Sequence, residues 1–193
     1  MFTVQLTQKG EKWVGFMYYR QKNRTALRSQ QMIVDALFIL MDRRPFQNIT
    51  VTEICEEAAI GRKTFYRNFE TREDVIDLRL DRLLEEYCAT VQGHEPEERL
   101  CLHFHFIHRH ADLLILLYRN GMSDAVNRKF SVLIPEILPI FSEDPVKQEY
   151  LFQFAALGLE GIEQVWIRRG FQESTEEVVE MAKKLLRTGI LNL

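Results

Sequence analysis

Apolar side chains recur every three or four positions along most of this chain, which is the spacing of one face of an α-helix. The first run covers residues 25–43 and predicts a long helix. Its apolar face consists of Leu27, Val34, Leu37, Phe38 and Met41. Later helices are predicted at about residues 72–91, 96–110, 111–120, 123–141, 145–169 and 175–190. No segment alternates strictly as a β-strand would, so the pattern predicts an all-α protein.

Two shorter helices are predicted between the first and second long ones. Pro45 ends the first long helix, and Thr50 and Glu53 form a capping box that starts the next. Gly61 interrupts that run before a helix over residues 62–69. A small core is expected to hold the pair together, made of Ile54, Ala58, Ile60, Phe65 and Phe69. The outer side of the second helix is expected to carry Arg62, Lys63, Thr64, Tyr66, Arg67 and Asn68.

Other helix starts carry equally local signals. Thr71 begins a capping sequence before the helix that follows it, and Ser174 with Glu177 forms another capping box. Asp144 stands before Pro145, which is an N-cap followed by proline at the first helical position. Residues 1–19 show no sustained period and are expected to form an arm, with Met17 as an alternative start.

Charge is distributed unevenly along the chain. Residues 20–72 carry ten Lys and Arg against six Asp and Glu, a net charge of +4. Residues 73–193 carry 13 bases against 21 acids, a net charge of -8. A basic segment on an acidic remainder suits a protein that binds a polyanion through one end. Chance clustering of surface charge is the alternative explanation of this feature alone.

The stretch ITVTEICEEAAIGRKTFYRNFETREDVI, residues 49–76, resembles the TetR/AcrR helix-turn-helix. The residues that carry the resemblance are Thr52, Ile54, Ala58, Ile60, Thr64, Phe65, Tyr66, Phe69, Arg72 and Glu73. Two positions depart from the family pattern. Ala59 stands where the family commonly has glycine, and a positive φ there would cost about 1 kcal/mol. Gly61 replaces the usual serine or threonine cap.

The resemblance implies a fold, a domain organisation and a function. It implies a three-helix DNA-binding domain at residues 20–71 and a larger helical domain for dimerisation and effector binding at residues 72–193. The expected protein is a transcription regulator, by family default a repressor, that binds a near-palindromic operator in double-stranded DNA as a homodimer. A small-molecule effector is its expected control, and no cofactor is expected.

The resemblance also assigns DNA contacts. The residues expected at base edges are Arg62, Lys63 and Thr64. The residues expected at phosphates are Arg24, Thr52, Tyr66, Asn68 and Arg72. Arg24 belongs to a group of basic residues at the start of the first long helix, where the helix dipole favours acids instead. Tyr66 has a second interpretation as a boundary aromatic whose hydroxyl reaches solvent.

Two sets of residues are candidates for the regulatory part. The segment WIRRGFQESTEEVVEMAKKL resembles the C-terminal portion of a TetR-like subgroup, in which the last two helices form a dimer bundle. The stripe expected at the dimer interface is Leu151, Ala155, Gly158, Ile162 and Val165, with a purely intramolecular core as the alternative. The expected effector pocket contains Phe104, His105, His108 and Tyr118, although aromatic spacing alone is also compatible with a filled core.

Cys101, His105 and His108 would share a helix face and could in principle hold a borderline metal ion. No metal is expected, because neither a Cys-x-x-Cys nor a His-Glu-x-x-His sequence accompanies them, and ligand or proton sensing is the alternative role. The three cysteines are odd in number and typical of buried free thiols, which favours a reducing cytoplasm.

Several function classes are disfavoured. No phosphate-binding glycine loop or nucleophile elbow supports an enzyme. No apolar run is long enough for a membrane span, and the start of the chain lacks a signal-peptide core. The alternatives to a DNA-binding regulator are a regulator that acts through a protein partner and a metal-sensing all-α protein.

Overall fold

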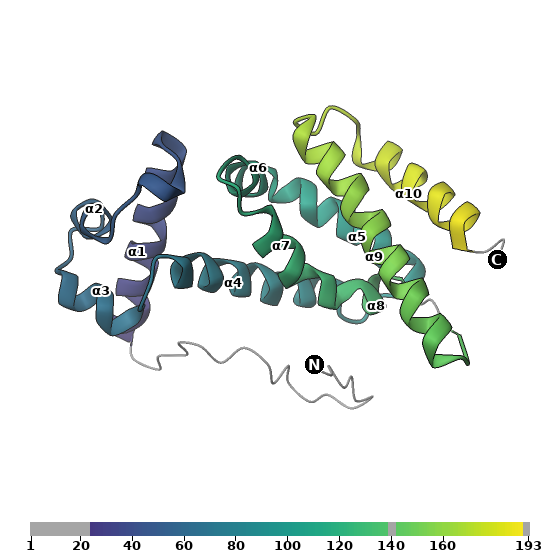
Figure 1. The fold of residues 1–193 in the computed structure, drawn as a ribbon, viewed down its shortest axis with the longest axis horizontal. Coiled ribbons are helices and arrows are strands. Elements are labelled where there is room, and N and C mark those ends of the chain that lie inside the picture. Colours follow the sequence, from purple (N-terminus) through teal and green to yellow (C-terminus); the bar gives the residue numbers. More distant parts are fainter. Residues whose placement is uncertain (1–23, 139–141, 191–193) are drawn as a thin grey trace. The chain divides into compact units, whose positions relative to one another are not determined.

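A computed structural model describes residues 24–138 and 142–190, which fold almost entirely into α-helices (Figure 1). No strand occurs in this described part, so the all-α prediction is confirmed. The arm predicted over residues 1–19, including Met17, lies outside the described residues.

The chain divides into two compact units between Leu83 and Leu84. We call the described residues 24–83 the head and residues 84–190 the body. Helix α4 contributes residues to both units because it continues across the division. The elements of the head are α1 (Arg24–Arg43), the 3-10 turn η1 (Phe46–Asn48), α2 (Val51–Glu57), α3 (Arg62–Asn68) and the first part of α4 (Glu73–Val91).

The head has one apolar core, against which α1 packs together with α2 and α3. Its large side chains include Ile33, Leu37, Met41, Ile54, Phe65 and Phe69, all almost fully buried. Leu27 was expected on the same face but is 45% exposed. The buried face runs backwards from Val34 through Gln30 to Ala26 at four-residue steps, and Leu27 lies one residue past that line.

The turn between α2 and α3 has the geometry of a helix-turn-helix. The Thr50 hydroxyl accepts the Glu53 N–H, and the Glu53 carboxylate accepts the Thr50 N–H at 2.8 Å, so the predicted capping box is confirmed. These bonds to Thr50 lower the pKa of Glu53. At the other end of α2, Ala59 has φ 51° and the Ile60 N–H donates to the Cys55 carbonyl. This is the Schellman ending that usually contains glycine.

Replacing Ala59 by glycine is expected to stabilise the head by about 0.5–1 kcal/mol. An alanine in the left-handed conformation costs about 1–2 kcal/mol, which glycine avoids. Glycine loses more chain entropy than alanine on folding, so the net gain in stability is smaller than that cost. Ala59 is exposed, so no packing is lost. Thermal denaturation measures the difference, and Ala58→Gly is the control because Ala58 is buried with φ -78° and should lose stability instead. A lower melting temperature for Ala59→Gly would show that the turn is not strained.

The body is built from the rest of α4 and the later helices. Their bounds are α5 (Pro96–Arg109), α6 (Ala111–Arg119), α7 (Ser123–Phe130), η2 (Ser131–Leu133), α8 (Ile134–Ile137), α9 (Pro145–Arg168) and α10 (Thr175–Ile190). The single helix predicted over residues 123–141 is therefore wrong. A new helix starts around Pro135, because proline has no N–H to continue the ladder of the preceding turn.

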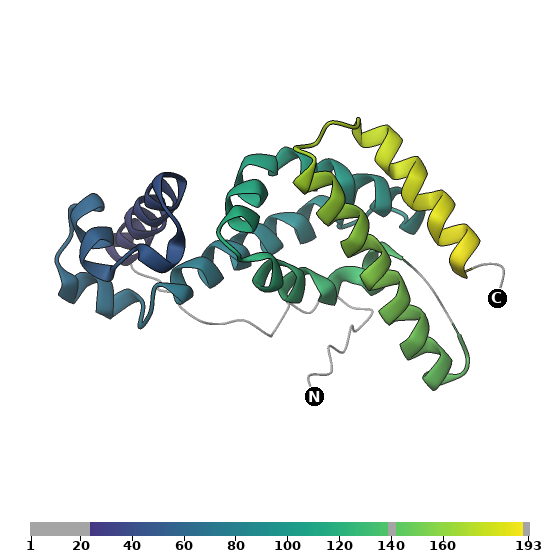
Figure 2. The same ribbon diagram turned by 45° about the horizontal axis from the view of Figure 1, so that its top comes forward.

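Helices α9 and α10 lie side by side in the body, and α10 also packs on α5 (Figures 1 and 2). Both predicted starts are confirmed: the Asp144 carboxylate accepts the Val146 N–H, and the Ser174 hydroxyl accepts the Glu177 N–H. The connection between the helices folds back on Trp166, whose indole N–H donates to the Glu173 carbonyl at 3.0 Å. The two helices therefore form one antiparallel pair.

Candidate nucleic-acid interface and interior polar cluster

Helix α3 presents a polar outer side to solvent. Arg62, Lys63 and Arg67 are exposed, and Tyr66 is 51% exposed with its ring against the edge of Phe65 at 5.5 Å. Thr64 is half-buried. Phe65 fixes this orientation because it is fully buried in the core of the head. The predicted base-contacting residues therefore occupy the accessible half of a short helix that is anchored from behind.

Asn68 does not lie on this outer side, so that part of the prediction is wrong. Its side chain is fully buried, and its Nδ2 donates to the Thr64 carbonyl at 2.7 Å. Asn68 is three residues after Phe65 and therefore faces the same core. In this structure its amide stabilises the last turn of α3 and is not accessible to a phosphate.

Some basic residues of the head are already paired with carboxylates, and the others remain available to bind a polyanion. Arg43 pairs with Glu57 at 3.1 Å, and Arg44 pairs with Glu53 at 2.8 Å, so both arginines tie the end of α1 to α2. In the part of the chain that the structure describes, the exposed basic residues without an ion pair in this head are Arg24, Arg28, Arg62, Lys63 and Arg67. Positive charge is thus left on α3 and on the start of α1.

Two other residues predicted to contact phosphates, Arg24 and Thr52, are accessible to solvent. Arg24 is exposed at the first residue of α1, and Thr52 is exposed in the first turn of α2. The beginning of α1 and helix α3 lie at the same end of the head (Figure 1). Arg24 therefore shares that end with the exposed residues of α3.

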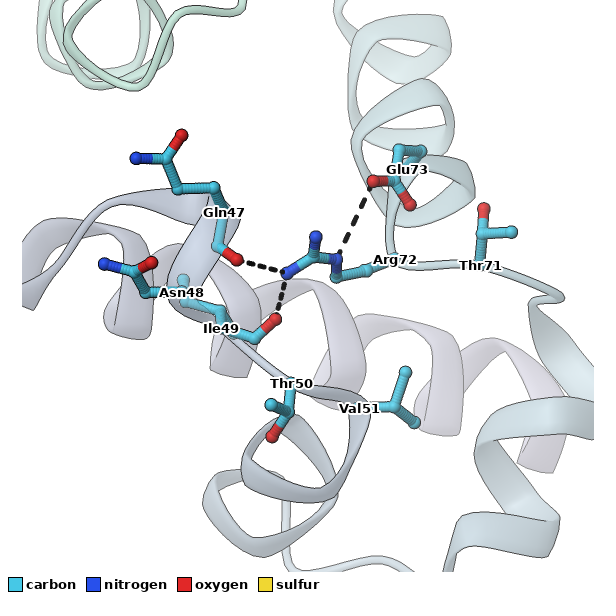
Figure 3. Close-up of a pocket in the computed structure, with 8 residues that line it drawn as sticks. All are labelled: Gln47, Asn48, Ile49, Thr50, Val51, Thr71, Arg72 and Glu73. Atoms are coloured by element: carbon cyan, nitrogen blue, oxygen red, sulfur yellow. Dashed lines mark hydrogen bonds and ion pairs between the residues drawn. The ribbon is translucent and has the colours of Figure 1, made fainter.

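Arg72 is bound inside the head (Figure 3). Its Nη1 donates to the Phe46 carbonyl at 2.9 Å and to the Ile49 carbonyl, and it lies 3.4 Å from the Gln47 carbonyl. The guanidinium also sits 4.7 Å from the centre of the Phe46 ring, which is a cation-π distance. Its Nε lies 3.7 Å from the Glu73 carboxylate. Arg72 therefore connects the start of α4 to the segment between α1 and α2.

These contacts form one wall of an open pocket with a volume of about 490 Å³. The residues that line it are Gln47, Asn48, Ile49, Thr50, Val51, Thr71, Arg72 and Glu73 (Figure 3). The Arg72 side chain is half-buried, and its Nη2 takes part in none of the bonds among the described residues. The role of Arg72 in holding the head together could not be read from the sequence, since its partners are backbone carbonyls more than 20 positions away.

The residues predicted for the effector pocket do not line one site. Phe104 is fully buried and packs on Trp166, with ring centres 6.0 Å apart. His108 Nδ1 lies 3.0 Å from the Thr175 hydroxyl, and its ring also faces Trp166. His105 is exposed, with Nε2 3.9 Å from the Glu176 carboxylate. Tyr118 belongs to a different group.

That group is a set of hydrogen-bonded polar residues in the body, of which His103 is buried and the others are half-buried. We call it the α9 polar cluster, and its members are His103, Tyr118, Asn127, Glu160, Glu163 and Gln164. Tyr118 donates to Asn127 Oδ1 at 3.0 Å, and Asn127 Nδ2 donates to Glu160 at 2.5 Å. His103 Nε2 lies 2.7 Å from Glu163. A signal was present in the sequence, since Glu160 and Glu163 lie within residues 154–167, whose other members are apolar or glycine except for Gln164.

The cysteines and histidines do not assemble into a metal site. In the described ranges, no group of three His, Cys, Asp or Glu side chains is placed to hold a metal ion. All three cysteines are free, but only Cys55 is buried, while Cys88 and Cys101 are half-buried, so the expectation of three buried thiols is wrong. Burial raises the pKa of the Cys55 thiol.

The stripe predicted for dimerisation is mostly covered by the chain itself. Ala155 is fully buried, and Leu151, Gly158 and Ile162 are half-buried, whereas Val165 is exposed. A neighbouring stripe on α9 is more exposed. We call it the α9 apolar face, and it consists of Val146, Tyr150, Phe154, Leu157, Gly161 and Val165. Met181 and Leu185 on α10 are also exposed.

Among the helices of the described residues, none combines the length and the apolar character that crossing a membrane requires.

Two family models match the chain. Residues 33–77 match the model described as bacterial regulatory proteins, tetR family, and residues 94–188 match the model described as transcriptional regulator C-terminal region. No curated protein matches the chain.

Three solved structures share the fold at 16% identity. A TetR transcriptional regulator from Streptococcus agalactiae 2603V aligns over 86% of this chain and 97% of its own, with a TM-score of 0.67. The fatty acid degradation regulator FadR from Bacillus halodurans aligns over 89% of this chain and 98% of its own, with a TM-score of 0.62. The dihydroxyacetone kinase operon activator DhaS aligns over 86% and 97%, with a TM-score of 0.58.

Proposed function

Because the chain belongs to the TetR family of bacterial transcription regulators, we propose that it binds a near-palindromic DNA operator as a homodimer under the control of a small-molecule effector. The family assignment agrees with the resemblance found in residues 49–76. We assign DNA binding to residues 20–71 and regulation to residues 72–193.

One observation carries the proposal. The outer side of α3 exposes Arg62, Lys63 and Tyr66, while the buried Phe65 holds the helix in a fixed orientation. A short helix of this kind enters the major groove with its first residues at the base edges. Selection of bound sequences from random DNA, followed by mobility shifts at several salt concentrations, tests it. A two-fold symmetric consensus and a steep loss of affinity with salt are expected, whereas no enriched sequence would contradict the proposal.

Arg62 is the residue proposed to read a base. Arg62→Ala is expected to weaken binding to the selected site by about 1–3 kcal/mol and to relax one base position, because arginine can donate two hydrogen bonds to guanine. Arg62→Lys is the matched variant. It keeps the charge but loses the paired geometry, so the salt dependence should persist while that base position relaxes. Equal losses on random and selected DNA would assign Arg62 to the phosphate backbone.

The homodimer is proposed to form through the α9 apolar face together with Met181 and Leu185. Exposed apolar patches of this kind usually mark an interaction surface, and Tyr150 is 75% exposed while Leu157 is 63% exposed. A two-fold axis uses the same face on both copies. Such a dimer would present two α3 helices to half-sites about one helical turn, roughly 34 Å, apart.

The chain is proposed to act as a repressor that leaves its operator when the effector binds. The activator DhaS has a similar fold, so the fold alone does not determine whether a protein represses or activates transcription. A reporter gene placed behind the selected operator should rise in expression when this chain is absent. A fall in expression would make the chain an activator and would leave its DNA binding unchanged.

A further inference from the structure

Two carboxylates on one side of α9 hold the centre of the α9 polar cluster. Glu160 and Glu163 are three residues apart, which makes them neighbours on the helix surface. Glu160 accepts hydrogen bonds from Asn127 at 2.5 Å and from Gln164 at 2.8 Å. Glu163 lies 2.7 Å from His103. The partners of Glu160 are thus neutral amides, which carry no compensating charge.

The negative charges of both carboxylates act on the Tyr118 hydroxyl. Burial raises the pKa of Tyr118, and the negative charges of Glu163 and Glu160 raise it further. Neither carboxylate forms an ion pair with lysine or arginine among the residues that the structure describes. The one histidine of the cluster can pair with at most one of the two carboxylates, and it lies beside Glu163. Partly buried charge of this kind is costly unless a cation approaches it.

His103 supplies an independent sign of a ligand. Its side chain is only 4% exposed, and its Nδ1 has no hydrogen-bond partner within the described part of the chain. Buried polar atoms are almost always hydrogen-bonded, so this nitrogen has capacity for a donor or acceptor from outside. The ring of Tyr87 stands edge-on to His103 at 5.6 Å, and Phe106 packs on Tyr87 at 5.1 Å. Aromatic rings attract cations and accept apolar groups.

We propose that the α9 polar cluster binds the cationic group of an organic effector. This group is a protonated amine or amidinium that donates hydrogen bonds to Glu160 and Glu163. The remainder of the effector would be aromatic or apolar, to match the aromatic side chains beside His103. A metal ion is disfavoured because the described residues offer no group of three ligands. The inference rests on the proposed effector control and names its chemical class.

Three probes of nearly equal shape test the charge preference: benzylamine, benzyl alcohol and benzoate. Calorimetric titration of the full chain at fixed pH and ionic strength should give benzylamine an affinity at least tenfold above that of benzyl alcohol, with benzoate the weakest. Glu160→Gln and Glu163→Gln should each lower the benzylamine affinity at least tenfold. Glu149→Gln is the matched control, since Glu149 is exposed near the start of the same helix.

Glutamine at position 160 can still accept from Asn127 and Gln164 through its amide oxygen, so this variant should fold, and its thermal melt verifies that. Equal affinity for the three probes, no detectable benzylamine binding, or unchanged affinity in both glutamine variants would overturn the inference. Operator binding is measured separately by mobility shift. A chain that binds DNA but not amines overturns this inference alone, and a chain that binds amines but no DNA overturns the proposed function.

Discussion

Arg72→Ala is expected to destabilise the DNA-binding head by about 2 kcal/mol, and not merely to remove one phosphate contact. The guanidinium group donates to carbonyls of the segment between α1 and α2 and packs over the Phe46 ring. Alanine removes the Arg72 donor from the Ile49 carbonyl, leaves the Phe46 carbonyl with only the Ile49 N–H, and opens the pocket beside Thr50. Since this segment positions α2 and hence α3, binding to selected and random DNA should fall together.

The melting temperature of the chain without DNA separates this role from a simple phosphate contact. A structural arginine lowers that temperature when removed, whereas a phosphate-contacting arginine only flattens the salt dependence of binding by about one unit. Arg67→Ala is the control, because Arg67 is exposed in the same head and should leave the melting temperature unchanged. An unchanged melting temperature for Arg72→Ala, with a flatter salt dependence, would contradict the structural role.

The contrast between the sequence and the structure of Arg72 reflects how local each signal is. The caps at Thr50, Asp144 and Ser174 were predicted correctly because each depends on bonds within three residues. The partners of Arg72 lie 23 to 26 positions earlier and are backbone atoms, so no residue type identifies them. Ala59 is an intermediate case, since the helix-turn-helix pattern itself requires a left-handed residue there.

Which side of a helix faces inward was the harder question. Three histidines lie in α5 and a fourth, His110, follows its last residue, and the structure buries His103 while it exposes His105. The spacing of apolar residues identifies one face of a helix but does not show which neighbouring helix covers that face. On α9 two adjacent stripes have similar spacing, and the packing of α6, α8 and α10 decides which one is covered. The polar cluster likewise depends on which helices meet, so Tyr118 was its only member singled out from the sequence.

The largest effect on assembly is expected from Gly161→Leu. A Cβ atom at Gly161 meets nothing within 4 Å in the chain itself, so the leucine side chain has room in the isolated protomer. Leucine is also a better helix former than glycine by up to about 1 kcal/mol. The protomer should therefore fold at least as well as before. If two α9 apolar faces pack together, the added side chain stands between helices that approach closely at this small residue, and the dimer should be lost.

Light scattering across a range of protein concentrations measures this outcome, together with mobility shifts on the selected operator. A monomer that retains a full helical spectrum but binds the palindrome weakly is the expected result, since each half-site alone contributes only part of the affinity. Glu149→Leu adds the same side chain at an exposed position outside the α9 apolar face and should remain dimeric. A stable dimer of Gly161→Leu, at concentrations where Glu149→Leu is also dimeric, would place the interface on another surface of the body. An increase in melting temperature without dissociation would have the same meaning, because it would show that the helix gained a better residue and that no partner helix lies against it.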